Sequence, residues 1–193
     1  MIAAAFAVIA PLVSPHLRAG ADEEIQPPFH LKWGEHALRL EEALLGTNAK
    51  IIERTKVAGG REIWKVDGLP GIALQRVNFH LREGRLVEVE LQYWKNDWSP
   101  ATYEEFMQSV RRRLEEKHGP GQAVTRQQET ERAIMKTLIG HRWESGGRAI
   151  ELYYFAAQDP KNLFRTISLH YQAAVVNSPE RHGTATPPLR LAE

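Results

Sequence analysis

The side chains best placed for chemistry lie in the stretch Arg76 to Trp94. It reads as two strands joined by a turn, and pairing their apolar faces sets His80 opposite Glu88, with Glu90 nearby. A carboxylate beside an imidazole fixes its tautomer and raises its basicity, so this group could act as acid and base. The same residues could form an ordinary cross-strand charge pair, which contributes about 0.2–1 kcal/mol. We favour the charge pair and keep the catalytic interpretation as the alternative.

Other signatures of catalysis or cofactor binding are missing from the sequence. His141 and Glu144 are three residues apart, but on a predicted strand this spacing puts them on opposite faces, which disfavours a shared metal. There is no Gly-x-Ser-x-Gly motif, and Ser145 precedes a Gly-Gly pair in a predicted hairpin turn. Neither Gly-Gly pair introduces a helix, so neither predicts a phosphate loop. We therefore assign no catalytic, cofactor-binding or metal-ligating residue and expect a protein without enzymatic activity.

The element that positions His80 is predicted to be an antiparallel hairpin. Apolar and polar residues alternate on both sides of a central Glu-Gly, which is typical of a half-buried strand pair. Pairing Leu81 with Val87 keeps both apolar sets on one face and leaves Glu83, Gly84 and Arg85 as the loop. The apolar set is Val77, Phe79, Leu81, Val87, Val89, Leu91 and Tyr93.

The rest of the chain predicts a two-layer α+β fold with an antiparallel sheet. A helix over 33–45, ended by Gly46 in a left-handed conformation, precedes two strands and the hairpin. A second helix begins after Ser99 and ends at Gly119-Pro120. The other predicted strands cover 50–57, 61–66, 122–128, 133–144, 148–156 and 163–171. A helix followed by four strands therefore occurs twice, which suggests a tandem repeat of units 33–98 and 99–173, forming one sheet or two.

The start of the chain is typical of a secretory signal peptide. An apolar run from Ile2 to Val13 leads to Ala19-Gly20-Ala21, small residues spaced as a cleavage site requires. We expect residues 1–21 to be removed and the protein to be periplasmic or extracellular; the alternative is an apolar leader that stays in the cytosol. Residues 22–32 are predicted to be a linker, and residues 174–193 a disordered tail.

The charge balance and the lack of cysteine exclude several classes of function. Removing residues 1–21 takes away Arg18 and no acid, so 24 basic residues face 24 acidic ones. A domain with no net charge lacks the excess of positive charge that attracts nucleic acid or an anionic membrane. The absence of cysteine excludes disulfides, a thiol nucleophile and a lipid-modified cysteine. The apolar core must stabilise the fold alone.

The first predicted unit resembles a known family of envelope domains. Trp33-Gly34, a helix closing in Leu44-Leu45-Gly46, Ile63-Trp64-Lys65-Val66 and the hairpin sequence VNFHLREGRLVEVEL occur in that order. This order is similar to that of small domains related to the β-lactamase inhibitor protein and to the small outer-membrane assembly lipoprotein. The resemblance covers Trp33 to Trp94, and the inhibitor's disulfides have no counterpart. It implies a two-layer α+β fold and a protein-binding role without catalysis.

Aromatic residues are predicted on the sheet face that points away from the core. Alternation assigns Ile150, Leu152, Tyr154, Ile167, Leu169 and Tyr171 to the core face. The opposite face then carries Tyr153, Phe155, Phe164 and His170, with Trp94 on the corresponding face of the first unit. A sheet face rich in aromatic residues is either covered by a helix of its own chain or contacts a partner.

These patterns lead to one hypothesis and two alternatives. We expect an interaction domain of the cell envelope or secretome whose partner is another protein. Its partner-binding residues are predicted to be Trp94, Tyr153, Phe155, Phe164, His170 and His80. The first alternative is a small hydrolase or small-ligand-binding protein that uses His80, Glu88 and Glu90. The second is a carrier of hydrophobic ligands, which would need an apolar cavity between helix and sheet.

Overall fold

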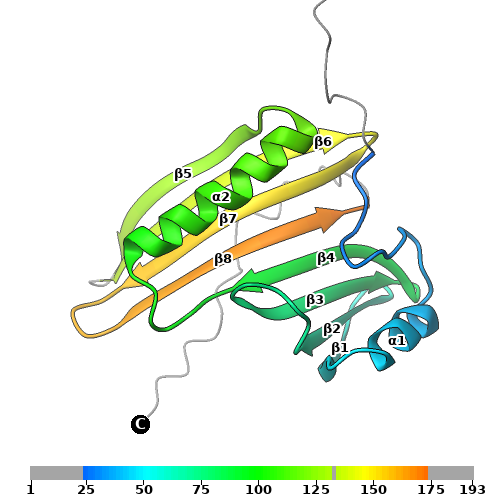
Figure 1. Ribbon diagram of the computed structural model, residues 1–193. Coiled ribbons are helices and arrows are strands. Elements are labelled where there is room, and N and C mark those ends of the chain that lie inside the picture. Colours follow the sequence, from blue (N-terminus) through cyan, green and yellow to red (C-terminus); the bar gives the residue numbers. More distant parts are fainter. Residues whose placement is uncertain (1–23, 132–133, 174–193) are drawn as a thin grey trace, which may run out of the picture.

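The computed structural model describes residues 24–131 and 134–173, which form one antiparallel sheet of eight strands with two helices (Figure 1). The helices are α1 (Ala37–Leu45) and α2 (Pro100–His118). The strands are β1 (Lys50–Val57), β2 (Arg61–Asp67), β3 (Leu74–Arg82), β4 (Arg85–Tyr93), β5 (Gln122–Glu131), β6 (Ile134–Ser145), β7 (Arg148–Gln158) and β8 (Leu163–Gln172). Their order in the sheet is β1-β2-β3-β4-β8-β7-β6-β5. The two halves therefore share one sheet, joined by the antiparallel pair β4 and β8.

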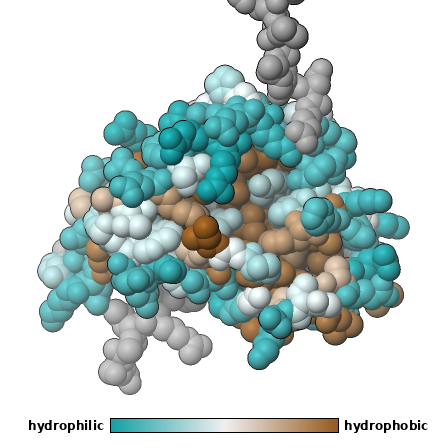
Figure 2. All heavy atoms as spheres, viewed as in Figure 1, coloured by the Kyte–Doolittle hydropathy of each residue, from teal (hydrophilic) through white to brown (hydrophobic). Residues whose placement is uncertain are grey.

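Both helices pack on one face of the sheet, and a single apolar core lies between them and the strands. Figure 1 shows α2 lying along β6 and β7, while α1 lies at the β1–β2 end, and Figure 2 shows apolar side chains gathered on this face between the two helices. Phe79 and Ile150 point into this core from the two halves, and Leu40 and Met107 face them from the two helices. The opposite face carries no helix of the described part of the chain. We call this helix-free side of the sheet the open face.

The β3–β4 hairpin has the predicted faces but a different turn. His80 pairs with Glu88, as predicted, yet Leu81 pairs with Leu86 rather than with Val87. The turn has only two residues, Glu83 and Gly84, both at positive φ (51° and 72°), as a two-residue hairpin turn requires. Val87 is the extra residue of a β-bulge, which restores the apolar alternation that the shorter turn would otherwise break. The predicted three-residue loop was therefore wrong.

The first helix is shorter than predicted and ends differently. It begins at Ala37, because Gly34 adopts a positive φ of 74° and its N–H donates to the Leu86 carbonyl at 2.9 Å. His36 caps the helix by accepting a hydrogen bond from the Leu38 N–H. Gly46 has a φ of −79°, so the predicted left-handed ending was wrong.

Residues 24–32, predicted as a linker, pack into the fold. The Ile25 side chain is fully buried, and its carbonyl accepts hydrogen bonds from Trp33 Nε1 at 2.8 Å and from Arg148 Nη1 at 3.3 Å. Glu24 also forms an ion pair with Arg148 at 2.6 Å. The segment thus ties the start of the first half to the β6–β7 end of the second.

The predicted signal peptide, residues 1–21, and the predicted tail, residues 174–193, lie outside the described residues. In the part of the chain that is described, no helix is long and apolar enough to cross a membrane.

Helix α2 begins as predicted, and its cap leads to the first testable prediction. The Ser99 side chain accepts a hydrogen bond from the Thr102 N–H at 3.1 Å, and Pro100 occupies the first turn. We expect Ser99→Ala to lower the free energy of unfolding by about 1 kcal/mol, because one donor of the first turn loses its partner. Ser99→Asp, which preserves the cap, serves as the control. Equal urea midpoints for the alanine variant and the wild type would contradict this.

Candidate interaction face and its polar network

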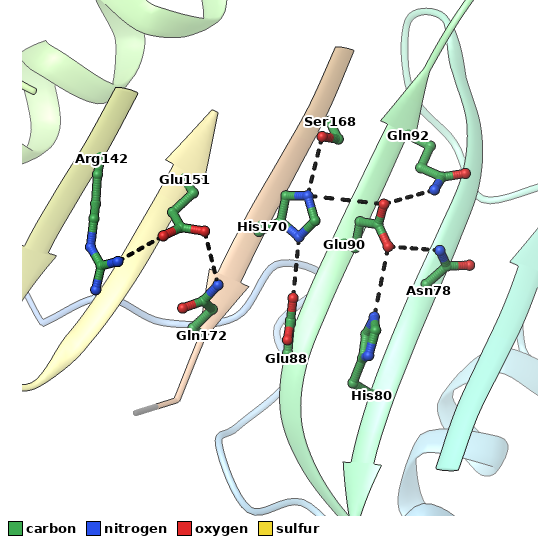
Figure 3. A network of polar contacts seen from close by, with 10 residues as sticks. All are labelled: Asn78, His80, Glu88, Glu90, Gln92, Arg142, Glu151, Ser168, His170 and Gln172. Atoms are coloured by element: carbon green, nitrogen blue, oxygen red, sulfur yellow. Dashed lines mark hydrogen bonds and ion pairs between the residues drawn. The ribbon is translucent and has the colours of Figure 1, made fainter. Parts of the chain in front are cut away.

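Ten polar side chains on the open face, drawn from β3, β4, β8, β7 and β6, form a network of two groups of contacts (Figure 3). They are Asn78, His80, Glu88, Glu90, Gln92, Arg142, Glu151, Ser168, His170 and Gln172. These positions alternate with the core residues on every strand, so the strand period places them together. The network crosses the β4–β8 pair, and it therefore connects the two halves of the sheet.

His170 lies at the centre of this network. Its Nδ1 is 3.1 Å from Glu88 Oε1, and its Nε2 is 3.1 Å from Ser168 Oγ and 3.9 Å from Glu90 Oε1. Burial alone would lower the pKa of His170, but the hydrogen bond with Glu88 and the charge of Glu90 outweigh it and raise the pKa. The His170 imidazole on β8 therefore sits between two carboxylates of β4 that favour its protonated form.

Glu90 is held as a carboxylate by its neighbours. Asn78 Nδ2 donates to it at 2.8 Å, Gln92 Nε2 donates at 2.7 Å, and His80 Nε2 lies 3.7 Å away. Burial would raise the pKa of Glu90, but the His80 imidazole, the charge of His170 and the two amide donors together lower it well below its usual range. Glu90 thus accepts hydrogen bonds from the first half of the sheet and lies within ion-pair distance of His170 in the second half.

The second group of contacts lies in the second half of the sheet, around Glu151. Arg142 Nη1 donates to this carboxylate at 2.8 Å, and Gln172 Nε2 donates at 3.1 Å. Sequence reasoning named His80, His170 and the two carboxylates of β4, but not Ser168, Glu151, Arg142 or Gln172. Their outward alternation was visible in the sequence. Their proximity depends on the registers of β6, β7 and β8, and the position of this half beside Glu88 and Glu90 depends on the pairing of β8 with β4, which the sequence does not specify.

The aromatic residues predicted to face outward do lie on the open face. Phe155 and Phe164 contact each other with ring centroids 6.1 Å apart. The Tyr153 ring meets His170 edge-on at 5.8 Å and lies over Gly140, where a Cβ would come within 2.6 Å of it. Trp94 lies just beyond β4. The Arg76 guanidinium lies over the Trp94 ring, with its central carbon 5.8 Å from the ring centroid. The outward side chains thus form an aromatic row beside a charge network.

The arrangement contains one geometry that resembles a hydrolase. Ser168, His170 and Glu88 are joined by two 3.1 Å contacts in the order of a serine–histidine–acid relay. However, the neighbouring carboxylates raise the pKa of His170 and favour the protonated form, which cannot accept a proton from the serine. In addition, Ser168 pairs with Gln92 on one side and Tyr153 on the other, so this central strand offers no free row of N–H donors for an oxyanion.

Metal binding also finds no support in the described part of the chain. No three His, Asp or Glu side chains there converge in a way that could hold a metal ion. His141 and Glu144 point to opposite faces of β6. His141 pairs with Leu152, which faces the core, whereas Glu144 lies two residues after Arg142 and therefore shares its outward face.

Comparison of the chain with protein-family models, with curated proteins and with solved structures finds no match. The function is therefore inferred from the geometry of the open face.

The raised pKa of His170 predicts a stability loss at alkaline pH. Because the folded pKa lies above the ordinary value of 6.5, protonation of His170 stabilises the fold fully below about pH 6.5. This contribution is lost as the pH rises through the folded value. We expect urea unfolding between pH 5 and 9 to show a decline in stability that His170→Gln removes. His30→Asn is the control, since His30 is exposed and its φ of 56° suits asparagine. A decline that persists in His170→Gln would contradict the assignment.

Proposed function

We propose that this chain is an exported, non-enzymatic interaction domain that binds another envelope or secreted protein through its open face. The observation that carries the proposal is the row of outward aromatic side chains on a sheet face without a helix. Phe164 is 39% exposed although its ring already contacts Phe155. Aromatic side chains that are held in place and partly exposed are the usual anchors of protein interfaces.

The polar network supports this role by preorganising the face. Its carboxylates already accept hydrogen bonds within the chain, as Glu90 does from Asn78 and Gln92 and Glu151 does from Arg142 and Gln172. A partner would therefore not have to neutralise a buried unpaired charge on binding. Ordered side chains also reduce the entropy lost in association. Affinity would then depend mainly on the aromatic row.

Export and internal duplication belong to the same proposal. The apolar leader with its Ala19-Gly20-Ala21 site supports export. A helix followed by four strands occurs twice along the chain. In the sheet, each set of four strands runs in sequence order from an outer edge to the centre, β1 to β4 from one edge and β5 to β8 from the other. This order supports a tandem repeat whose units pair through their last strands. The resemblance of the first unit to inhibitor-like envelope domains points to the same protein-binding role.

The hydrolase alternative has one observation in its favour, the alignment of Ser168 with His170 and Glu88. An activated serine reacts with a fluorophosphonate probe. We expect no labelling of the folded protein at pH 7 to 9. Labelling of Ser168 that disappears in His170→Gln would establish the alternative and overturn the non-enzymatic proposal.

Site-specific photo-crosslinking tests the interaction proposal. A benzoylphenylalanine replaces Phe164 on the open face or, as the control, Leu45, an exposed apolar residue at the end of α1. In cells that express the full chain, we expect a discrete protein adduct from position 164 and none from position 45. The same adducts from both positions, or none from position 164, would contradict the proposed function.

A further inference from the structure

An open hollow of about 450 Å³ lies at the rim of the sheet, between the segment that joins β4 to α2 and the start of β8. Its lining includes four aromatic side chains and two cationic ones: Trp94, Trp98, Tyr103 and Phe164, and Lys95 and Arg165. Trp94 and Phe164 also belong to the aromatic row. The hollow therefore continues the proposed interaction surface and differs from the rest of it in charge.

The walls of the hollow are fixed by one tyrosine of α2. The Tyr103 hydroxyl accepts a hydrogen bond from the Lys95 N–H at 3.0 Å and lies 3.0 Å from the Lys95 carbonyl and 3.3 Å from the Arg165 carbonyl, either of which can accept its proton. It thereby joins the backbone of the β4–α2 segment to that of β8. Trp98 meets the same tyrosine ring edge-on, with centroids 5.2 Å apart. The two cationic residues are thus held on adjacent, connected segments.

The two cations have no carboxylate partner in the described structure. Within residues 24–131 and 134–173, neither Lys95 nor Arg165 forms an ion pair, although Arg165 interacts with the Tyr154 hydroxyl. Asp97, the nearest acid along the chain, does not line the hollow. This contrasts with the central network, where each carboxylate is hydrogen-bonded internally. Positive charge beside exposed aromatic surface favours an anion that carries an apolar body.

We propose that this hollow binds an acidic–aromatic segment of the partner protein. A carboxylate would lie between Lys95 and Arg165, and an adjoining aromatic side chain would pack against Trp94 and Phe164. The inference rests on the proposed function and adds the chemistry of the partner. A small aromatic acid carries the same two groups, one carboxylate and one aromatic ring, so it can serve as a probe.

Nuclear magnetic resonance of the tryptophan indole N–H groups provides the test. The full chain is titrated with 3-phenylpropionate and, separately, with 3-phenylpropanamide, a neutral compound of the same shape. We expect saturable shifts of the Trp94 and Trp98 signals with a Kd on the order of millimolar for the acid. The amide should bind at least about 10-fold more weakly. Equal binding of the two compounds, or no saturable shift with the acid, would overturn the inference.

Charge variants locate the effect. In Lys95→Gln/Arg165→Gln the acid should bind no better than the amide, while Lys161→Gln should behave as the wild type. Lys161 is an exposed cation of the nearby β7–β8 loop that does not line the hollow. Preference for the acid that survives the double change would contradict the assignment. A crosslink from position 164 combined with failure of this titration would remove only the acidic–aromatic inference, whereas loss of the crosslink would remove the proposed function itself.

Discussion

Replacing Glu90 with alanine is expected to lower the free energy of unfolding by about 3 kcal/mol, because it breaks a partly buried charged network from one side. Asn78 and Gln92 lose their shared acceptor, and the protonated His170 loses one of its two neighbouring carboxylates. Glu90→Gln retains one acceptor oxygen and should lose less. Urea unfolding at pH 6, where His170 is protonated, measures the difference.

The matched control for Glu90 is Glu53→Ala on the edge strand β1. Glu53 pairs with Lys65 at 2.7 Å, but both side chains are substantially exposed, so solvent screens the interaction and little change is expected. If Glu90→Ala and Glu53→Ala lowered the free energy of unfolding by the same small amount, the open-face network would not stabilise the junction of the two halves. That result would contradict the description of Glu90 as a carboxylate that links β3 and β4 to His170 of β8.

Replacing Phe79 with alanine should cost about 3–5 kcal/mol, the usual cost of removing a fully buried phenylalanine ring. Phe79 is 0% exposed, pairs with Val89 and Trp64 across the sheet, and meets Phe29 edge-on at 6.4 Å. Phe164→Ala removes the same group from the open face and should cost about 1 kcal/mol or less. Thermal and urea unfolding of the two variants compare the two faces of one sheet directly. Similar losses would mean that the open face is a second core.

The sequence predicted the faces of the sheet better than its turns. Alternation placed Phe79 inward and His80 outward, and both positions are confirmed. The turn after Arg82 was wrong by one residue, because a β-bulge at Val87 gives the same alternation as a longer loop. The burial of Ile25 was also not predicted. The sequence before Trp33 is polar and contains prolines, and a single apolar residue in such an irregular segment gives no periodic pattern that indicates burial.

The candidate site could be predicted only in part. The pairing of His80 with Glu88 followed from local hairpin geometry. The contacts of His170 with Glu88 and Ser168 could not be foreseen together, because Glu88 and His170 lie 82 residues apart and no local pattern specifies which strands become neighbours. The same is true of the hollow, since Lys95 and Arg165 come to line it through the pairing of β4 with β8 and through Tyr103, which contacts the backbone of both segments.

The measurement that tests the central claim most directly combines stability with partner capture. Trp94, Tyr153, Phe155 and Phe164 are changed together to serine, and a benzoylphenylalanine at Gln92, on the same face, reports the partner. The account predicts a protein that still unfolds cooperatively in urea but no longer forms the crosslinked adduct seen with the unaltered row. A variant that fails to fold would show that these side chains belong to a core. A folded variant that still captures the partner would show that the aromatic row does not bind it.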